Sequence, residues 1–490
     1  MAAPAASAPA YRQLLVDGQW RPSSTRAERA VIDPSDGSHI IEVADATTAD
    51  AAAAAKSAAD SFASGAWRRL TPAARAKVLW RVADLIEANA AALASLETRN
   101  GGKPWTAALG GEVPFAAECF RYYAGWCTKL EGRSKSISSV GTARMHSYTR
   151  LEPIGAVALI VPWNGPLVQA SWKLAPALAA GCSCVLKPDE HTPLSALHLG
   201  ALLLEAGVPP GVVNVIPGDG RVGAALVSSP DIAKVSFTGS TATGRKVLAE
   251  CSNDLRKVTL ELGGKSPLVV FADADIERAI DGASRAIFDN AGQVCVAGSR
   301  LYAEASVYER VLAGIAERAQ KLRVGPASDP DTEMGPVISA AHLRNICAHV
   351  DSGRRQGARI VVGGAAFDRR SGFYMQPTVL ADVQPTMQVV QEEIFGPVLA
   401  AQSFASFHEA LQLANDTRYG LAGSVWTDDI NKAHTFAEEL RAGLVWINCH
   451  GVPDMAVPFG GYRQSGWGRE NGYEGLLEYT EHKSVMAMLR

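Results

Sequence analysis

The chain has 490 residues, enough for roughly three units of about 150 residues each. Hydrophobic residues make up 47% and charged residues 20%, with a mean hydropathy of +0.02, a balance typical of a globular chain rather than a disordered one. The 47 basic and 50 acidic residues leave a net charge of −3, which excludes a chain-wide cationic field for nucleic acid or an anionic membrane.

The cysteines and the amino terminus indicate a reducing compartment. Of eight cysteines, the only closely spaced pair, Cys182 and Cys184, is separated by one residue, which fits neither zinc nor redox C-x-x-C spacing. Residues 1–10, MAAPAASAPA, lack the basic and long apolar segments of a signal peptide, so we expect a frayed tail. The most apolar stretch, 167–186, contains polar residues and a proline and makes a poor membrane span. We therefore predict a cytoplasmic protein with no metal site and no membrane partner.

Helix starts can be predicted on both sides of residue 150. In the Ala-rich region before it, Thr71 is a good N-cap and Pro72 suits the first helical position. After it, Thr192 and Pro193 predict a second helix start, and Gly207 predicts its end.

From residue 156 onward, short apolar strands alternate with helical segments, which predicts a doubly wound parallel sheet. The strands are continuous or β-branched apolar runs, as expected where both faces of a sheet are covered. They are AVALIVP (156–162), CVLKP (184–188), VNVIPG (213–218) and KVSFTG (234–239). In such sheets, ligands collect beyond the carboxyl ends of the strands.

The remaining segments suggest a second domain and an arm. ELGGKSP (261–267) contains a Gly-Gly break, which we interpret as a crossing between domains. Residues 131–150 are rich in Ser and Thr and predict an exposed hairpin or arm, and HKSVMAML (482–489) predicts a further strand. Strand–helix alternation resumes between them at IVVGG (360–364), GSVWT (423–427) and LVWIN (444–448).

Three residues could carry covalent chemistry. Cys295, in FDNAGQVCVAGSR (288–300), has small neighbours that let a substrate approach, although its thiol becomes a strong nucleophile only when its pKa falls below about 8.5. Asn164 follows a buried strand and could donate to a developing oxyanion. Glu261 precedes two glycines and could act as a general base. Taken singly, an apolar filler, a loop cap and a surface carboxylate are the commoner explanations.

Other residues could hold a dinucleotide. FTGSTATG (237–244) lies between a strand and a helix, where backbone N–H groups can bind a pyrophosphate, although it departs from the strict G-x-G-x-x-G spacing. Lys187 and Glu190 end the neighbouring strand and could hold ribose hydroxyls. Glu393 and Phe395 could supply another ribose ligand and a ring that packs on nicotinamide. Alone, each of these is more often a surface charge or a core residue.

The order and spacing of these motifs closely resemble the NAD(P)-dependent aldehyde dehydrogenase superfamily, in its hydrolytic, non-acylating branch. The resemblance runs from DGQW (17–20) to YTEHKSV (479–485) and includes PFGGYRQSGWGRE (458–470). It implies an α/β enzyme with a Rossmann-like doubly wound coenzyme domain, an α/β catalytic domain and a small β arm that bridges subunits. The implied boundaries are 1–130 with 154–262, 263–462, and 131–153 with 478–490 respectively. The resemblance also implies a homodimer or homotetramer.

Carried over by position, the resemblance implies a role for each catalytic candidate. Cys295 adds to the aldehyde, the Asn164 amide and the Cys295 N–H form the oxyanion hole, and Glu261 activates the water that hydrolyses the thioester. The implied coenzyme contacts are Trp163, Lys187, Glu190, Gly239, Ser240, Glu393 and Phe395. A carboxylate at Glu190 favours NAD because it repels a 2′-phosphate, although Lys187 nearby leaves NADP possible.

One departure from the family pattern bears on the substrate. Gly165 stands where the family often has an aromatic residue, so the tunnel is expected to be roomy and to suit a bulky apolar or aromatic aldehyde. No cationic residue is expected to line this tunnel, which disfavours a strongly acidic substrate. Betaine-aldehyde, amino-aldehyde and general aliphatic substrates stay open. The residues expected to line the tunnel are Gly165, Gln169, Trp172, Val294, Val296, Val452 and Phe459.

Three other classes fit less well. A CoA-acylating dehydrogenase typically dispenses with the base, which Glu261 would supply here. A catalytically silent binding or structural member of the fold should lack some of the three catalytic positions. A cysteine hydrolase needs a histidine beside the thiol, and His191 and His450 lie in stretches that the dehydrogenase resemblance already explains.

Overall fold

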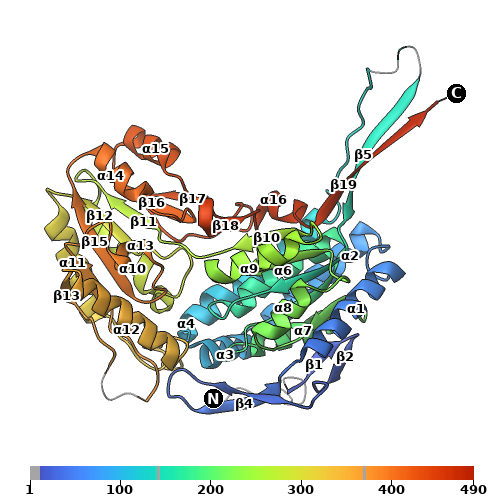
Figure 1. Ribbon diagram of the computed structural model, residues 1–490, viewed down its shortest axis with the longest axis horizontal. Helices are drawn as coiled ribbons and strands as arrows, with labels where there is room; N and C mark the ends of the chain where they lie inside the picture. The colour runs from blue at the N-terminus through green and yellow to red at the C-terminus, as the bar shows by residue number, and fades with distance from the viewer. Residues whose placement is uncertain (1–11, 139–140, 142–143, 368–370, 490) are drawn as a thin grey trace.

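Two parallel-rich sheets and a projecting two-stranded arm make up the computed structural model, which describes residues 12–138, 141, 144–367 and 371–489 (Figure 1). The predicted α/β class is confirmed. The tail expected at 1–10 lies outside the described residues, as do 139–140, 142–143 and 490 of the predicted arm.

The first sheet has a parallel centre with antiparallel edges. Its strand order is β18-β10-β9-β6-β7-β8-β1-β2, and β6 to β10 run parallel to one another. From β6 the chain moves outward through β7 and β8, then returns to add β9 and β10 on the other side, which is the doubly wound topology predicted for this segment. The strands are β1 (Leu14–Val16), β2 (Gln19–Arg21), β6 (Ala156–Ile160), β7 (Ser183–Lys187), β8 (Val213–Val215), β9 (Lys234–Thr238), β10 (Lys257–Glu261) and β18 (Gly466–Trp467).

Helices cover both faces of this sheet. They are α1 (Thr48–Ser64), α2 (Pro72–Ala88), α3 (Ala90–Gly101), α4 (Trp105–Ala107), α5 (Val113–Trp126), α6 (Pro166–Ala180), α7 (Leu194–Glu205), α8 (Gly220–Val227) and α9 (Thr241–Ser252), with a π-helix, η2 (Ala108–Glu112), before α5. Helix α2 starts as predicted, since Thr71 caps it and Pro72 is its first residue.

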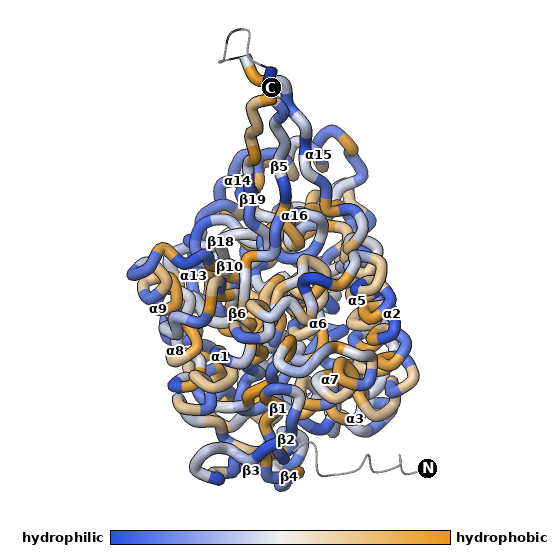
Figure 2. Tube along the Cα trace, turned by 90° about the vertical axis from the view of Figure 1, so that its right-hand side faces the viewer, coloured by the Kyte–Doolittle hydropathy of each residue, from blue (hydrophilic) through white to orange (hydrophobic). Residues whose placement is uncertain are grey.

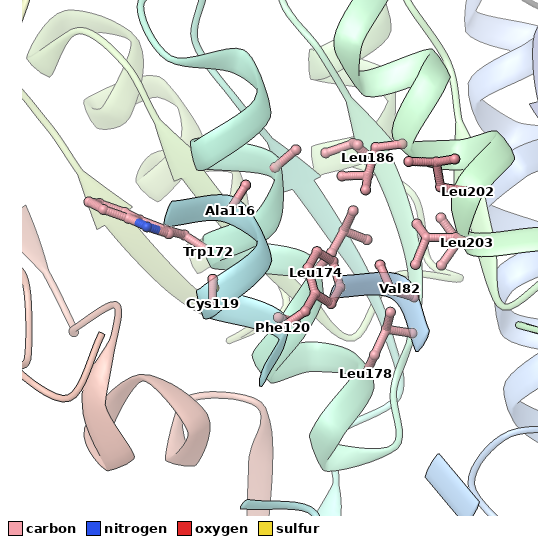
Figure 3. Packing of buried hydrophobic residues seen from close by; sticks show 14 of the residues in the cluster. Val82, Ala116, Cys119, Phe120, Trp172, Leu174, Leu178, Leu186, Leu202 and Leu203 are labelled. Atoms are coloured by element: carbon pink, nitrogen blue, oxygen red, sulfur yellow. The ribbon is translucent and has the colours of Figure 1, made fainter. Parts of the chain in front are cut away.

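Helix α6 is the centre of the larger core. Every one of its residues is buried, as expected for a helix that is apolar on nearly all sides. Figure 3 shows Leu174 and Leu178 of this helix packed among Phe120 of α5, Val82 of α2 and Leu203 of α7. The apolar stretch 167–186 is thus divided between α6 and β7, and no helix among the described residues is long and apolar enough to cross a membrane.

The predicted start of α7 is wrong by one residue. The helix begins at Leu194 and Pro193 takes the N-cap position. The hydroxyl of Thr192 is buried and has no hydrogen-bond partner within the residues that the structure describes. The cap comes from another helix instead, because the side-chain oxygen of Asn100 in α3 accepts from the Leu194 N–H at 3.2 Å. Asn100, which is far away in sequence, therefore supplies the cap that Thr192 was predicted to supply.

The chain crosses to the second sheet at residues 262–266, between β10 and β11. This sheet has the order β13-β14-β15-β12-β11-β16-β17 and is parallel except at β13. Its strands are β11 (Pro267–Val270), β12 (Arg300–Glu304), β13 (Arg359–Val362), β14 (Thr378–Ala381), β15 (Val398–Phe404), β16 (Ala422–Trp426) and β17 (Leu444–Ile447). Its helices are α10 (Ile276–Phe288), α11 (Tyr308–Lys321), α12 (Ala340–Arg355), α13 (Gln388–Gln391), α14 (Phe407–Asn415) and α15 (Ile430–Glu439).

The last part of the chain returns to the first sheet and then forms the arm. Strand β18 pairs with β10, and after α16 (Gly472–Leu477) the chain enters β19 (Thr480–Met488), which pairs antiparallel with β5 (Met145–Pro153). The arm projects from the body in both views (Figures 1 and 2). A separate hairpin joins β3 (Glu28–Ile32) and β4 (His39–Ala44).

Candidate active site

One cavity, of about 1090 Å³, lies beyond the carboxyl ends of β6, β7 and β9. The chain leaves β6 and β9 in opposite directions along the sheet, so this is the switch point where doubly wound folds bind their ligands. Five residues predicted to contact coenzyme line it, namely Trp163, Lys187, Glu190, Gly239 and Ser240. We refer to it as the coenzyme cavity.

The residues of the coenzyme cavity fit a dinucleotide. Ser240 caps α9, and its side chain accepts from the Thr243 N–H, so the positive end of a twelve-residue helix faces the cavity. The hydroxyl of Thr238 is buried there without a hydrogen-bond partner in the described part of the chain, which leaves one polar group for a ligand to satisfy. Lys187 is buried, and this burial lowers the pKa of its amine, which lies 4.0 Å from the Glu190 carboxylate.

Glu393 and Phe395 do not line the coenzyme cavity. The Glu393 carboxylate accepts from the Gly264 N–H at 3.0 Å, and burial raises its pKa to about 7. The ring of Phe395 meets the ring of Trp163 edge-on, with centroids 5.3 Å apart. Phe395 therefore contacts Trp163, a residue of the cavity wall. Glu393 instead lies beside Gly264, where the chain crosses to the second sheet.

A second cavity, of about 830 Å³, begins where the first one ends. Trp163 lines the coenzyme cavity, and the next two residues, Asn164 and Gly165, line this second cavity together with Cys295. All the other residues expected to line the tunnel also lie on its wall, namely Gln169, Trp172, Val294, Val296, Val452 and Phe459. We refer to it as the aldehyde cavity.

Side chains from the loop after β6 and from the turn after α10 hold the Cys295 loop, which precedes β12. The Asn164 amide donates to the Gln293 carbonyl at 2.9 Å, and the Asn290 amide donates to that carbonyl and to the Asn164 carbonyl, both at 3.2 Å. Farther along, the Cys295 carbonyl faces Gly264 so closely that a Cβ atom there would lie 2.5 Å from it. These contacts fix the Asn164 amide beside the thiol segment.

The turn before Cys295 is strained. Asn290, Ala291 and Gly292 have φ angles of 49°, 54° and 70°, a left-handed run that costs roughly 1 kcal/mol or more for a residue such as alanine. Gly292 must be glycine, since a Cβ atom there would lie 2.1 Å from the Gly396 carbonyl oxygen. Strain of this kind persists only where surrounding contacts enforce it, and it is concentrated at functional sites.

Glu261, the last residue of β10, is buried and lines neither of the two cavities. It is 3% exposed, and neither of its carboxylate oxygens has a hydrogen-bond partner among the described residues. Burial raises its pKa well above the ordinary value, and the nearby Glu470 raises it further. Beneath it, Glu470 forms a buried ion pair with Lys173, which also donates to Ser236 at 2.9 Å.

The Cys295 thiol is protonated at neutral pH in this environment. Burial raises its pKa to about 12, and the carboxylates of Glu261 and Glu393 add to the shift because they repel a thiolate. The thiol must therefore lose its proton as it attacks.

Sequence reasoning missed several residues of the aldehyde cavity. Phe115 and Trp446 add aromatic walls, and the ring of Trp172 lies 6.1 Å from Phe115 and 5.1 Å from Phe459, centroid to centroid. Phe115 follows the π-helix η2, a feature frequent at functional sites, but no signal in the sequence marks it.

The expectation of a tunnel without cationic residues is wrong. Lys103 and Arg285 both line the aldehyde cavity, and the Lys103 amine is paired with the Glu112 carboxylate. The sequence could not place these two residues in the cavity. Lys103 lies more than 40 residues before Gly165, and Arg285 lies more than 100 residues after it. No group of three His, Cys, Asp or Glu that could hold a metal occurs among the described residues.

A doubly wound sheet with a cavity at its switch point, next to a second cavity that contains a cysteine, suits an oxidoreductase that uses a dinucleotide and a thiol. A family profile described as the aldehyde dehydrogenase family matches residues 20–485. The chain is 43% identical to a phenylacetaldehyde dehydrogenase of Pseudomonas fluorescens over 97% of this chain and 95% of that one. The chain therefore belongs to the aldehyde dehydrogenase family and is an NAD(P)-dependent aldehyde dehydrogenase.

Solved structures agree with this assignment. An NAD+ complex of aldehyde dehydrogenase from Bacillus cereus superposes with a TM-score of 0.96 at 42% identity, covering 98% of this chain and 97% of that one. Betaine aldehyde dehydrogenase from Staphylococcus aureus, also in complex with NAD+, has a TM-score of 0.95 at 40% identity, covering 97% of this chain and 94% of that one.

Proposed function

We propose that this enzyme oxidises a bulky apolar or aromatic aldehyde to the carboxylic acid through a thioester on Cys295. The observation that carries the proposal is that the two cavities adjoin each other. Asn164 and Cys295 line the aldehyde cavity, and Trp163, which directly precedes Asn164, lines the coenzyme cavity. A thiol and an amide donor thus meet a carbonyl where a coenzyme can also reach it.

In the first half of the reaction, the Cys295 sulfur adds to the aldehyde carbon while the thiol proton passes to solvent water. The resulting oxyanion accepts from the Cys295 backbone N–H and from the Asn164 amide, whose other N–H is held by the Gln293 carbonyl. When bound, NAD(P) supplies the hydride acceptor that converts the thiohemiacetal to a thioester.

In the second half, Glu261 takes a proton from a water molecule that attacks the thioester. The carbon–sulfur bond breaks, the acid leaves, and the proton held by Glu261 passes to the Cys295 sulfur. Because burial raises the pKa of Glu261, the base is strong when ionised, and turnover is lost as the pH falls through that raised pKa.

The test is the near-ultraviolet absorbance of reduced nicotinamide with NAD or NADP across aliphatic, aromatic and amino-aldehydes. The Glu261→Gln variant, mixed with substrate and coenzyme, should accumulate an acyl adduct on Cys295 that intact-mass spectrometry detects. Turnover by this variant at the wild-type rate, with no adduct, would remove Glu261 as the base.

The aromatic walls and the open space at Gly165 support a bulky substrate. A Cβ atom at Gly165 would come no closer than 3.8 Å to any neighbour, so the space that a side chain would fill is free. Phe115, Trp172 and Phe459 offer ring faces and edges to an aromatic group.

An amino-aldehyde or a betaine-type aldehyde is the second candidate, and Glu112 favours it. One of its carboxylate oxygens is buried, has no hydrogen-bond partner over the described ranges, and lies 3.8 Å from the Cβ position at Gly165. A cationic or donor group of a substrate could pair with it there. Glu112→Gln should lower kcat/KM for amino-aldehydes and leave benzaldehyde-type substrates unchanged if this candidate is right.

We also propose NAD as the preferred coenzyme, a cytoplasmic location, and a homodimer or homotetramer joined through the β5–β19 arm. The carboxylate of Glu190 at the coenzyme cavity supports the first. The arm supports the last, because its outer residues Met486 and Met488 are 67% and 69% exposed. Sedimentation of the intact protein and of a variant with both methionines changed to serine tests this assembly.

A further inference from the structure

We propose that His450 is a positioning residue for Cys295: its imidazole fixes the backbone just after the thiol by joining the Val296 carbonyl to Ser424 of β16. The inference rests on the proposed role of Cys295 as nucleophile.

Both ring nitrogens of His450 are engaged. Nε2 lies 2.8 Å from the Val296 carbonyl oxygen and Nδ1 lies 2.9 Å from the Ser424 hydroxyl. A carbonyl oxygen can only accept, so Nε2 carries the proton and Nδ1 accepts from the hydroxyl. The pair of contacts therefore selects one neutral tautomer of the imidazole.

The anchor at the far end is rigid. Ser424 is fully buried in β16, which pairs with β11 on one side and β17 on the other. The His450 backbone is held nearby, since the Asn448 side chain both accepts from the Thr427 N–H at 3.0 Å and donates to the Thr427 carbonyl at 2.9 Å. The imidazole thus connects the Cys295 loop to β16 and fixes the position of the loop relative to the second sheet.

The ring also packs behind the loop. A Cβ atom at Gly298 would lie 3.4 Å from the His450 ring, and the ring of Trp446 is 4.9 Å away, centroid to centroid. Burial lowers the pKa of His450 to about 4, so the neutral form persists at neutral pH.

Cys295 is therefore held from both directions. Before it, Asn164 and Asn290 hold the Gln293 carbonyl, and after it His450 holds the Val296 carbonyl. The thiol and the Cys295 N–H lie between these two anchors. With both of its nitrogens occupied, His450 is not free to take the thiol proton, so it acts through the backbone.

The experiment compares four variants of the full-length enzyme. His450→Leu removes the N–H that donates to the Val296 carbonyl, and His450→Gln restores an N–H that can reach it. Ser424→Ala removes the hydroxyl that donates to Nδ1 of His450. His434→Leu changes an exposed histidine on α15 and is the matched control. The measurements are kcat, KM, the thermal midpoint and the rate at which iodoacetamide alkylates Cys295, followed by peptide mass spectrometry.

We expect His450→Leu to lower kcat by about 10- to 100-fold with KM changed less than about threefold, because misplacing a reacting group acts mainly on the chemical step. Alkylation of Cys295 should slow with kcat. His450→Gln should recover to within about threefold of wild type, Ser424→Ala should fall between the two, and His434→Leu should match wild type.

Two outcomes would overturn the inference. One is wild-type kcat and alkylation in His450→Leu. The other is a His450→Gln variant as impaired as His450→Leu, since the restored donor would then be irrelevant. If His450→Leu does not fold, Ser424→Ala decides alone, and wild-type kcat there counts against the proposal. Failure of the nucleophile assignment itself appears separately, as turnover by Cys295→Ala.

Discussion

The coenzyme cavity and the aldehyde cavity adjoin each other but are assembled in different ways. Apart from Thr48, the coenzyme cavity is lined by residues 160–250, from the ends of successive strands and the starts of the helices that follow. The aldehyde cavity gathers residues from 103–115, 164–172, 285–296 and 443–471, together with Glu333. The first is a product of local topology, whereas the second forms only when both sheets are packed together.

This difference predicts that the two cavities can be altered independently. The largest effect should come from Cys295→Ala, which removes the thiol from the aldehyde cavity. Turnover should fall by at least about 1,000-fold because no covalent intermediate can form. Coenzyme affinity, measured by quenching of tryptophan fluorescence, should stay within twofold of wild type. Lost coenzyme binding would mean that the cavities are coupled.

A bulky side chain at Gly165 should separate substrates by size. The φ angle of Gly165 is −158°, outside the left-handed region that favours glycine, and a Cβ atom there has room, so Gly165→Phe places a ring in the cavity. We expect kcat/KM for aromatic aldehydes to fall by about 10- to 200-fold relative to small aliphatic ones. Gly165→Ala is the control and should be nearly silent, and an equal loss for all aldehydes would contradict the steric explanation.

A smaller effect is expected on the coenzyme side. Glu190→Gln removes the carboxylate that faces the cavity and leaves the Lys187 amine, so the ratio of kcat/KM with NADP to that with NAD should rise by about tenfold. The matched control is Glu250→Gln, a carboxylate of α9 that lines the same cavity. Equal gains in both variants would show a general charge effect rather than recognition at Glu190.

The smallest expected effect concerns stability. Because the folded-state pKa of Glu261 is raised, folding favours its protonated form, and this contribution is lost as the pH rises above the ordinary glutamate value toward the raised pKa. Glutamine cannot ionise, so Glu261→Gln does not lose this stabilisation. The variant should unfold roughly 2 °C higher than wild type at alkaline pH, with no rise in the unfolding temperature at pH 4. A gap that does not change with pH would rule out ionisation as its cause.

The same contrast explains how much could be predicted from the sequence. The α/β class and strands such as 156–162 follow from continuous apolar runs, which are local signals. Residues 239–240 could be located because they follow a predicted parallel strand and precede a helix, whereas Trp163 was assigned through the family resemblance. The family resemblance supplied the grouping of Asn164, Glu261 and Cys295, which spacing alone did not favour.

Features that depend on packing could not be predicted. Asn100 caps α7 from another helix, and Lys103 reaches the aldehyde cavity from a segment with no chemical motif. The short strand β18 joins the first sheet after the chain has passed through the second one. In each case the partner lies far away in sequence, and no local pattern encodes it.

The late arrival of β18 and β19 has a consequence for synthesis on the ribosome. Among the described residues, strand β10 has no antiparallel neighbour until residues 466–467 are made. Strand β5 pairs with Ser134 on one edge, but its other edge has no neighbour until 480–488 are made. A nascent chain that is almost finished therefore carries two open strand edges, which are templates for aggregation. Translation must run through β19 before both are closed, so we expect a premature stop codon shortly before this strand to be as damaging as an early one.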